Sequence, residues 1–135
     1  MKILIAILFI ISCFSIESCS KGDEELLPFA DTMPQFPGGP SEMYKFIYTE
    51  IKYPQQAKDN GICGTVVIKF YVDKAGFLRD IHIVDGPGYG LDEEALRVVT
   101  LMNKDHRWRP AVHEGKLVRV EFTLPIKFVL QHMNC

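Results

Sequence analysis

The residues with the greatest capacity for chemistry are four histidines and four cysteines. The histidines stand at His82, His106, His113 and His132. No two of them are spaced four residues apart on a helix with a glutamate, and no CxxC pair occurs, so the spacing typical of metal sites is missing. Cys63 precedes Gly64 at the expected start of a strand, where a cysteine is more typical of packing or of a disulfide than of a nucleophile. We therefore expect no metal site and no catalytic cysteine.

A glycine-rich loop at residues 86–90 leads into a helix that the apolar pattern predicts from Leu91. A loop of this kind before a helix is typical of phosphate binding, but the lysine of a phosphate loop is missing. Asp92, Glu93 and Glu94 occupy the first turn, where the helix dipole stabilises acids and where they would repel an anion. Consecutive helical residues also point in different directions, so these acids are not paired for acid–base chemistry. We expect no cofactor and predict that the protein is not an enzyme.

The charge balance argues against nucleic acid as a partner. The 135 residues carry a formal net charge of −2, whereas nucleic-acid-binding domains are typically basic. The stretch Arg107-Trp108-Arg109 is similar to a base-stacking site, but Glu114 follows closely. We interpret Trp108 as a residue that covers the core, and we expect no nucleic-acid binding.

The N-terminus carries the pattern of an export signal. Lys2 precedes an apolar run, residues 3–11, that is too short for a typical membrane span. Cys13 and Cys19 each follow a serine and have isoleucine three residues before, a spacing that resembles a lipoprotein signal with a lipidated cysteine. Cys13 has the cleaner motif, but Cys19 precedes a polar Ser-Lys-Gly-Asp-Glu-Glu stretch and is the lipidation site we favour. An ordinary signal peptide cut near Ser18 and an uncleaved anchor are the alternatives.

The length allows one domain together with an export segment. Prolines and glycines are dense between Ser20 and Pro40, which is typical of a linker. The predicted organisation is a signal peptide over residues 1–18, a flexible tether over 19–35, a domain over 36–130 and a tail over 131–135.

Apolar residues at helical spacing predict two main helices. The first begins after Ser41, its expected N-cap, and ends before Tyr53-Pro54, because the residue before a proline avoids the α conformation. One further turn follows over residues 55–59. The second helix begins at Leu91. The expected apolar stripes are Met43, Phe46, Ile47 and Ile51 in the first helix, and Leu91, Ala95, Val98, Val99 and Met102 in the second.

A period of two predicts three strands, over residues 64–72, 77–84 and 117–130. Gly76 supplies the positive φ that the turn between the first two requires. The residues of the second strand that we expect to share one face are Phe77, Ile81 and Ile83. The order helix, hairpin, helix, strand predicts an α+β fold, with a small three-stranded antiparallel sheet packed against two helices.

Two cysteines remain if Cys19 is lipidated. Cys63 lies at the start of the first strand and Cys135 lies beyond the last. If those strands are antiparallel neighbours, the thiols approach each other, and an oxidising envelope compartment permits a disulfide between them.

The last strand is the strongest candidate for a binding surface. Its even positions from 118 to 130 are all apolar, so we expect one face of the strand to be buried and the other to be exposed to solvent. Pro125 has no N–H to give a neighbour, which predicts an edge strand, and an edge strand is a template for another chain. If the missing N–H faces the open edge, the odd residues offer their amides to a partner. The expected docking ladder is Leu117, Arg119, Glu121 and Thr123.

Taken together, these elements resemble the C-terminal domain of TonB, the energy transducer of Gram-negative envelopes, in its Bacteroidetes branch. The resemblance covers about residues 36–130. It is carried by Phe36-Pro37-Gly38-Gly39, Lys52-Tyr53-Pro54, Gly61-Ile62-Cys63-Gly64-Thr65-Val66, Val72-Asp73-Lys74-Ala75-Gly76, Leu91-Asp92-Glu93-Glu94-Ala95-Leu96, Trp108-Arg109-Pro110-Ala111 and Leu124-Pro125-Ile126-Lys127-Phe128.

The resemblance implies a periplasm-facing binding module, anchored to a membrane of the cell envelope through Cys19. Its last strand would capture a short extended segment, the TonB box, of a TonB-dependent outer-membrane receptor, and would thereby serve energised transmembrane transport. In the family the residues before Tyr-Pro also approach the receptor, which adds Glu50, Lys52 and Tyr53 to the expected site.

Two alternatives stay open. An uncleaved N-terminus would let the protein act as a short transducer with inner-membrane motor proteins as partners. An adaptor that dimerises through the same edge strand, without energy transduction, would use the domain differently.

Overall fold

The computed structural model describes residues 25–132 and residue 135. Two helices and a sheet make up most of the domain, and a short helix and two short strands complete it. In chain order the elements are β1 (Leu26–Leu27), α1 (Pro40–Glu50), α2 (Gln55–Asp59), β2 (Gly64–Val72), β3 (Leu78–Asp85), α3 (Leu91–Asp105), β4 (Ala111–His113) and β5 (Lys116–Phe128).

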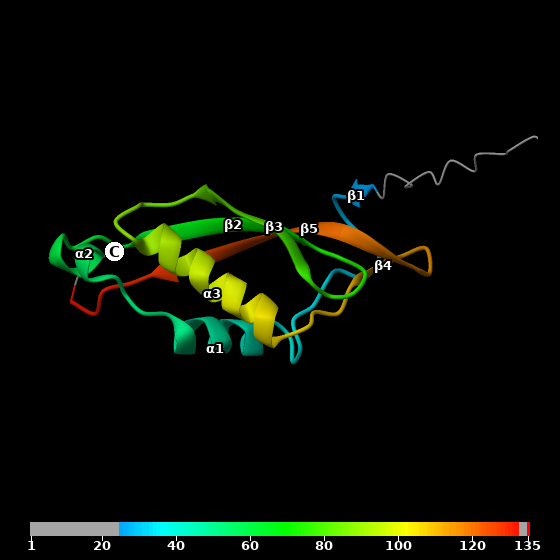
Figure 1. The fold of residues 1–135 in the computed structure, drawn as a ribbon, viewed down its shortest axis with the longest axis horizontal. Coiled ribbons are helices and arrows are strands. Elements are labelled where there is room, and N and C mark those ends of the chain that lie inside the picture. Colours follow the sequence, from blue (N-terminus) through cyan, green and yellow to red (C-terminus); the bar gives the residue numbers. More distant parts are fainter. Residues whose placement is uncertain (1–24, 133–134) are drawn as a thin grey trace, which may run out of the picture.

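The strands form one twisted sheet in the order β1-β5-β2-β3, with β4 paired to the start of β5 (Figure 1). Strands β2 and β5 are antiparallel along their whole contact, from the pair Gly64–Phe128 to the pair Val72–Val120, with no shift of register. Strand β1 is parallel to β5. The helix α2 lies at one end of the sheet, and β1 and β4 lie at the other (Figure 1).

The predicted α+β class is confirmed, but the predicted sheet is too small. Within the described residues, five strands are present where three were predicted, and β1 makes the sheet mixed where it was predicted to be antiparallel. A strand of two or three residues shows no period, because alternation needs several positions, so β1 and β4 left no signal in the sequence.

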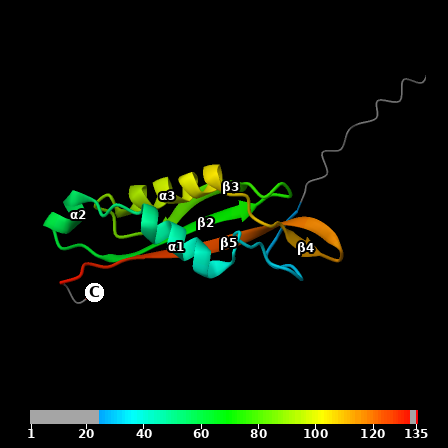
Figure 2. The same cartoon turned by 90° about the horizontal axis from the view of Figure 1, so that it is seen from below.

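The core lies between the sheet and the helices α1 and α3, which cover the same face (Figures 1 and 2). Helix α3 packs beneath β3 and β2, and α1 lies beside α3, toward β5 (Figure 2). The predicted stripe of α3 is fully buried. In α1, Met43 and Ile47 are buried, while Phe46 and Ile51 are partly buried against the same core. The helical spacing was therefore a sound guide to the buried faces.

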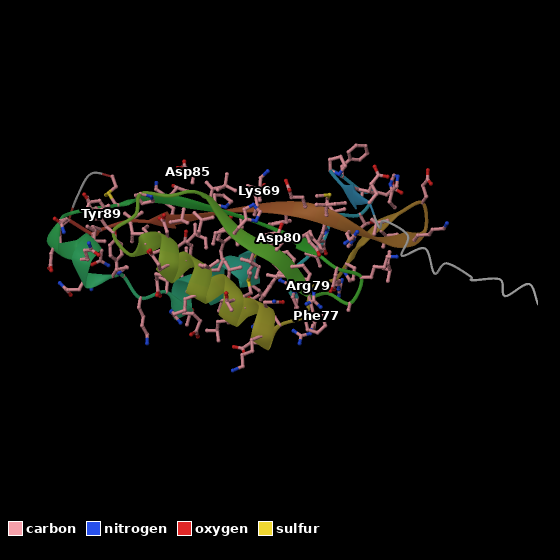
Figure 3. The ribbon with its side chains drawn as sticks, turned by 45° about the horizontal axis from the view of Figure 1, so that its top comes forward. Lys69, Phe77, Arg79, Asp80, Asp85 and Tyr89 are labelled. Atoms are coloured by element: carbon pink, nitrogen blue, oxygen red, sulfur yellow. A yellow bond between two sulfur atoms is a disulfide. The ribbon has the colours of Figure 1, made fainter. Side chains whose placement is uncertain are left out.

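Strand β3 departs from its predicted pattern. Phe77 was predicted to share a face with Ile81 and Ile83, and this is wrong, because Leu78 is the buried residue. Asp80 has a φ of 52°, and the register of β3 against β2 shifts at two places. This β-bulge inserts an extra residue and reverses the alternation before it. Figure 3 shows Phe77, Arg79 and Asp80 at this end of the strand and Asp85 at the other.

The turn between β2 and β3 shows why position 76 is glycine. Gly76 has a φ of 85°, as predicted, and its carbonyl accepts a hydrogen bond from the N–H of Trp108 at 3.0 Å. A Cβ at this position would lie 2.2 Å from the carbonyl oxygen of Trp108. The hairpin turn therefore holds the segment before β4 in place.

Cys63 and Cys135 are joined by a disulfide, with a Cα–Cα distance of 6.2 Å. That distance falls within the usual range for such a bond. Since Gly64 pairs with Phe128, the bond links the start of β2 to the residues that follow β5. The end of β5 is thus fixed on both sides of its last pair.

The described part of the predicted tether lies on the sheet. Leu26 and Leu27 form β1, the N–H of Thr32 donates to the carbonyl of Val112 at 2.9 Å, and the N–H of Gln35 donates to the carbonyl of Arg109 at 3.1 Å. The predicted signal peptide, Cys13 and Cys19 lie outside the described residues. Within residues 25–132, no helix combines the length and the apolar character needed to cross a membrane.

Candidate functional site: the free edge of strand β5

One side of β5 is only partly paired. The other side of β5 has β2 as its neighbour from Val120 to Phe128. Strand β5 also pairs with β4 at residues 116–118 and with β1 at Arg119 and Val120. From Glu121 to Phe128, β2 is the strand partner that the described chain provides. We call residues 121–128 the free edge of β5.

Pro125 indicates which amides of the free edge point outward. It lies opposite Val67 in an unbroken ladder. Since proline cannot donate, this pair fits the kind that exchanges no hydrogen bond, so the N–H position of Pro125 points away from β2. Glu121 and Thr123 have the same parity as Pro125. Their amides are therefore directed toward the open side.

The two faces of the free edge differ in chemistry. On the outer face, Lys69 Nζ donates to Glu121 Oε1 at 2.8 Å, and the guanidinium of Arg119 lies 5.4 Å from the ring centre of Tyr71. On the inner face Leu124, Ile126 and Phe128 are buried in the core. A strand added here would meet charged groups on one face and apolar side chains on the other.

The structure divides the predicted docking ladder into two parts. Leu117 lies opposite Val112 of β4, and Arg119 lies opposite Leu26 of β1. Glu121 and Thr123 lie on the free edge. The ladder was predicted without β1 and β4, whose brevity hid them in the sequence.

The predicted residues before Pro54 lie at the far end of β5 from Leu117. The ring of Tyr53 meets the ring of Phe128 edge to face, with centres 5.7 Å apart, and its hydroxyl donates to the carbonyl of Ile62. Glu50 is the last residue of α1, and Lys52 lies in the link to α2. Tyr53 is thus brought next to the free edge.

Glu94 and Arg97, on α3, hold this segment in place. The backbone N–H of Lys52 donates to Glu94 Oε1 at 2.7 Å, and Arg97 Nη2 donates to the carbonyl of Glu50 at 2.9 Å. Arg97 also pairs with Glu94 at 2.7 Å. The sequence suggested only that Glu94 is an N-terminal acid of its helix. The i, i+3 spacing to Arg97 was a signal for the ion pair, but not for its bonds to residues 50–52.

The pKa of Glu94 reflects this environment. Partial burial raises the pKa of the carboxyl, but the hydrogen bonds from Arg97 and from the N–H of Lys52 outweigh it, so the pKa lies below its ordinary value. The charged form of Glu94 is therefore favoured in the folded protein.

Among the described residues, no group of three or more acidic, histidine or cysteine side chains is placed to hold a metal ion.

A helix-backed sheet with one free edge and with apolar and charged faces defines a small protein-interaction domain. Residues 49–130 match the family model of the Gram-negative bacterial TonB protein C-terminal domain, and the chain belongs to this family. The resemblance drawn from the sequence is thereby confirmed. The family is a non-catalytic, protein-interacting family of the Gram-negative envelope, so the chain contains a TonB-like envelope domain.

Solved structures give the same fold. A solution structure of the Helicobacter pylori TonB C-terminal domain is 22% identical, with a TM-score of 0.54 over 72% of this chain and 89% of that one. A shorter form of the same domain is 23% identical, with a TM-score of 0.52 over 69% of this chain and 95% of that one. The comparison with curated proteins gave no match.

Proposed function

We propose that the free edge of β5 captures an extended segment, the TonB box, of a TonB-dependent outer-membrane receptor, in the service of energised transport. The observation that carries the proposal is the unbroken β2–β5 register, which leaves a regular edge from Glu121 to Phe128. Domains of this family interact with TonB-dependent receptors. Strand addition to such an edge gives affinity through main-chain hydrogen bonds.

Strand β1 supports the same conclusion from within the chain. Leu26 and Leu27 pair in parallel with Arg119 and Val120, immediately before the free edge. This side of β5 therefore accepts an added strand in the folded domain. Glu121 and Thr123 continue the row of outward amides past β1.

The location follows from the family, and the anchor is a further part of the proposal. We infer that the domain faces the periplasm, held to a membrane through a lipidated Cys19. Lipid attachment at Cys19 is checked by mass spectrometry of the purified protein, with Cys19→Ser and Cys13→Ser as paired variants. Loss of lipid in the Cys13→Ser variant alone would show that Cys13, and not Cys19, carries the lipid.

Replacing Glu121 by proline tests the capture directly. The change removes an outward amide from the free edge while leaving the bonds to β2, so binding of synthetic TonB-box peptides should fall below detection and the melting temperature should change little. Titration calorimetry measures the first and thermal unfolding the second.

The matched control is Glu121→Ala, which keeps the amide but loses the ion pair to Lys69. An exposed pair of this kind contributes only about 0.2–1 kcal/mol, so peptide binding should persist. Unchanged binding by the proline variant would contradict capture at this edge. Sedimentation of the wild-type protein alone would show whether the edge instead pairs with a second copy.

A further inference from the structure

We propose that a groove between α1 and the free edge of β5 selects the captured segment by two apolar side chains six residues apart. This inference rests on the proposed function, because it assumes that a strand is added at that edge. The groove consists of two cavities and the tyrosine pair between them.

The first cavity lies beside Phe122. It has a volume of about 320 Å³ and its lining includes Met33, Met43, Tyr44, Trp108 and Phe122. Trp108 is only 3% exposed, and its Nε1 is buried without a hydrogen-bond partner. Apolar and aromatic side chains make up most of the lining, so the cavity suits an apolar side chain.

The second cavity lies beside Phe128, at the other end of the free edge. Its volume is about 230 Å³, and Tyr48, Ile51, Tyr53 and Val129 line it with Phe128. Val129 is 52% exposed, so the cavity is open to a partner. Both cavities are lined by residues of α1 and of β5 and by none of β2 or β3, so they lie between α1 and β5.

Two tyrosines of α1 separate the cavities. Tyr44 borders the first and Tyr48 the second. Their rings are stacked, with centres 6.2 Å apart and an interplanar angle of 18°. Their spacing of four residues puts them on one side of the helix, as a continuous apolar wall along β5.

Strand geometry converts this arrangement into a sequence pattern. Side chains of an added strand that lie opposite the even positions of β5 point to the face that α1 covers. Phe122 and Phe128 are six residues apart, roughly 20 Å along a strand. The residues opposite them would enter the two cavities, and those between would meet the tyrosine wall. The spacing is the same for a parallel and for an antiparallel segment.

The described part of the chain does not supply this segment itself. Before β1, Glu25 lies with Lys116 and Leu117 at the start of β5. After β1, Thr32 bonds to Val112 of β4. The chain thus approaches and leaves β1 at the end away from Phe128. An extended segment of another protein is the occupant that fits.

Two heptapeptides of equal composition test the pattern. One carries leucine at positions 1 and 7 with serine and threonine between, and the other carries leucine at positions 2 and 6. In the second peptide the leucines are four residues apart, so they cannot enter both cavities. The second peptide can place only one leucine in a cavity, so the two peptides differ by one buried leucine. We expect the first peptide to bind about tenfold more tightly than the second.

Tryptophan fluorescence reports on the first cavity, because Trp108 is the only tryptophan in the sequence. Binding of the first peptide should shift its emission, and the second should shift it less. Equal affinity and equal shifts would overturn the groove while leaving edge capture intact. Binding of TonB-box peptides without binding of either heptapeptide would do the same. If neither kind of peptide binds, capture at the edge fails, and this inference fails with it.

Surface variants test each cavity separately. Met33→Glu and Val129→Glu place a charge at a cavity mouth without changing the core, since these side chains are 41% and 52% exposed. Each should weaken the first peptide by about tenfold. The control is Val84→Glu on β3, at a residue that is 51% exposed on the opposite edge of the sheet. A similar loss in all three variants would contradict the groove.

Discussion

The two long strands that flank β2, which are β5 and β3, are built in opposite ways. Strand β5 keeps one register against β2 from Val120 to Phe128. Strand β3 shifts its register twice and holds Asp80 at a φ of 52°. The bulge bends β3, and charged residues line it, including Arg79, Asp80 and Asp85 (Figure 3).

The difference shows how one sheet can hold both a closed and an open edge. Bulges and charges are the usual means of preventing an edge from pairing with another chain. The register shifts lie on β3, whereas residues 121–128 of β5 keep one register against β2, and the charge of Glu121 is paired with Lys69. The regular register of β5 is therefore what the proposed strand capture requires, and the bulges of β3 would keep an added strand from the opposite edge.

The largest effect on stability is expected from removing the disulfide between Cys63 and Cys135, which fixes the end of β5. A bond that closes a loop of this length, with a separation of 72 residues, stabilises the fold by about 4 kcal/mol in the chain-entropy account. Cys63→Ser should lower the free energy of unfolding by an amount of this order, measured by urea denaturation. Hydrogen exchange should show a greater loss of protection at Ile126 than at Ile83 of β3.

The matched variants are Cys135→Ser and the double variant. All three remove the same bond, so their losses should be equal and should not add. Additive losses would show that each cysteine acts through its own packing, and equal loss of protection in both strands would mean that the bond does not act on β5 in particular.

An intermediate effect is expected when low pH protonates Glu94, whose carboxylate holds the segment of residues 50–52 beside the end of β5. The folded pKa of Glu94 lies below the ordinary value of 4.5. A carboxyl with a lowered folded pKa contributes stability above its unfolded pKa and loses it as the pH falls through the folded value. Stability should therefore fall below about pH 4.5, and Glu94→Gln should make that fall smaller while costing about 1 kcal/mol at pH 7.

Thermal unfolding between pH 3 and pH 7 measures this dependence. Glu93→Gln is the control, because among the described residues this neighbouring acid makes no hydrogen bond to residues 50–52, so the variant should keep the wild-type profile. An unchanged profile in the Glu94→Gln protein would remove Glu94 from the support of this segment.

The smallest effect is expected at the bulge of β3. Asp80→Gly relieves a left-handed backbone conformation that costs a side chain about 1 kcal/mol, so the variant should be slightly more stable. Deletion of Asp80 should instead restore a straight edge and cause association that grows with concentration, seen by sedimentation. A deletion variant that folds and stays monomeric would show that the bulge is not what closes this edge.

The sequence predicted two kinds of feature in the fold. One kind is an apolar pattern that repeats over many residues, and the other is a position where the backbone admits only one type of residue. The α3 stripe and the alternation of β2 and β5 repeat over many residues, so chance matches are few. Gly76 was predictable because its turn requires a positive φ. Pro125 indicated an edge because it has no donor.

Other features depended on contacts between distant segments. Helix α1 begins at Pro40, with Gly39 as its N-cap and not Ser41 as predicted, because proline is favoured at the first helical position and outweighed the serine. The bond from Lys52 to Glu94 spans 42 residues and leaves no local pattern. Trp108 was interpreted as core cover, and its burial agrees with that, but its unpartnered Nε1 could not be anticipated.

By itself, the sequence determined the class of fold, the family and the strand that offers an edge. Each of these rests on local rules, such as the alternation of β5 and the missing donor of Pro125, which hold wherever the strand is placed. The tertiary structure decided how much of that edge is free, because β1 pairs with Arg119 and Val120 and leaves residues 121–128 open. It also decided what lies beside the edge, since the walls of the groove come from α1, from the segment before it and from Trp108, which only packing brings together.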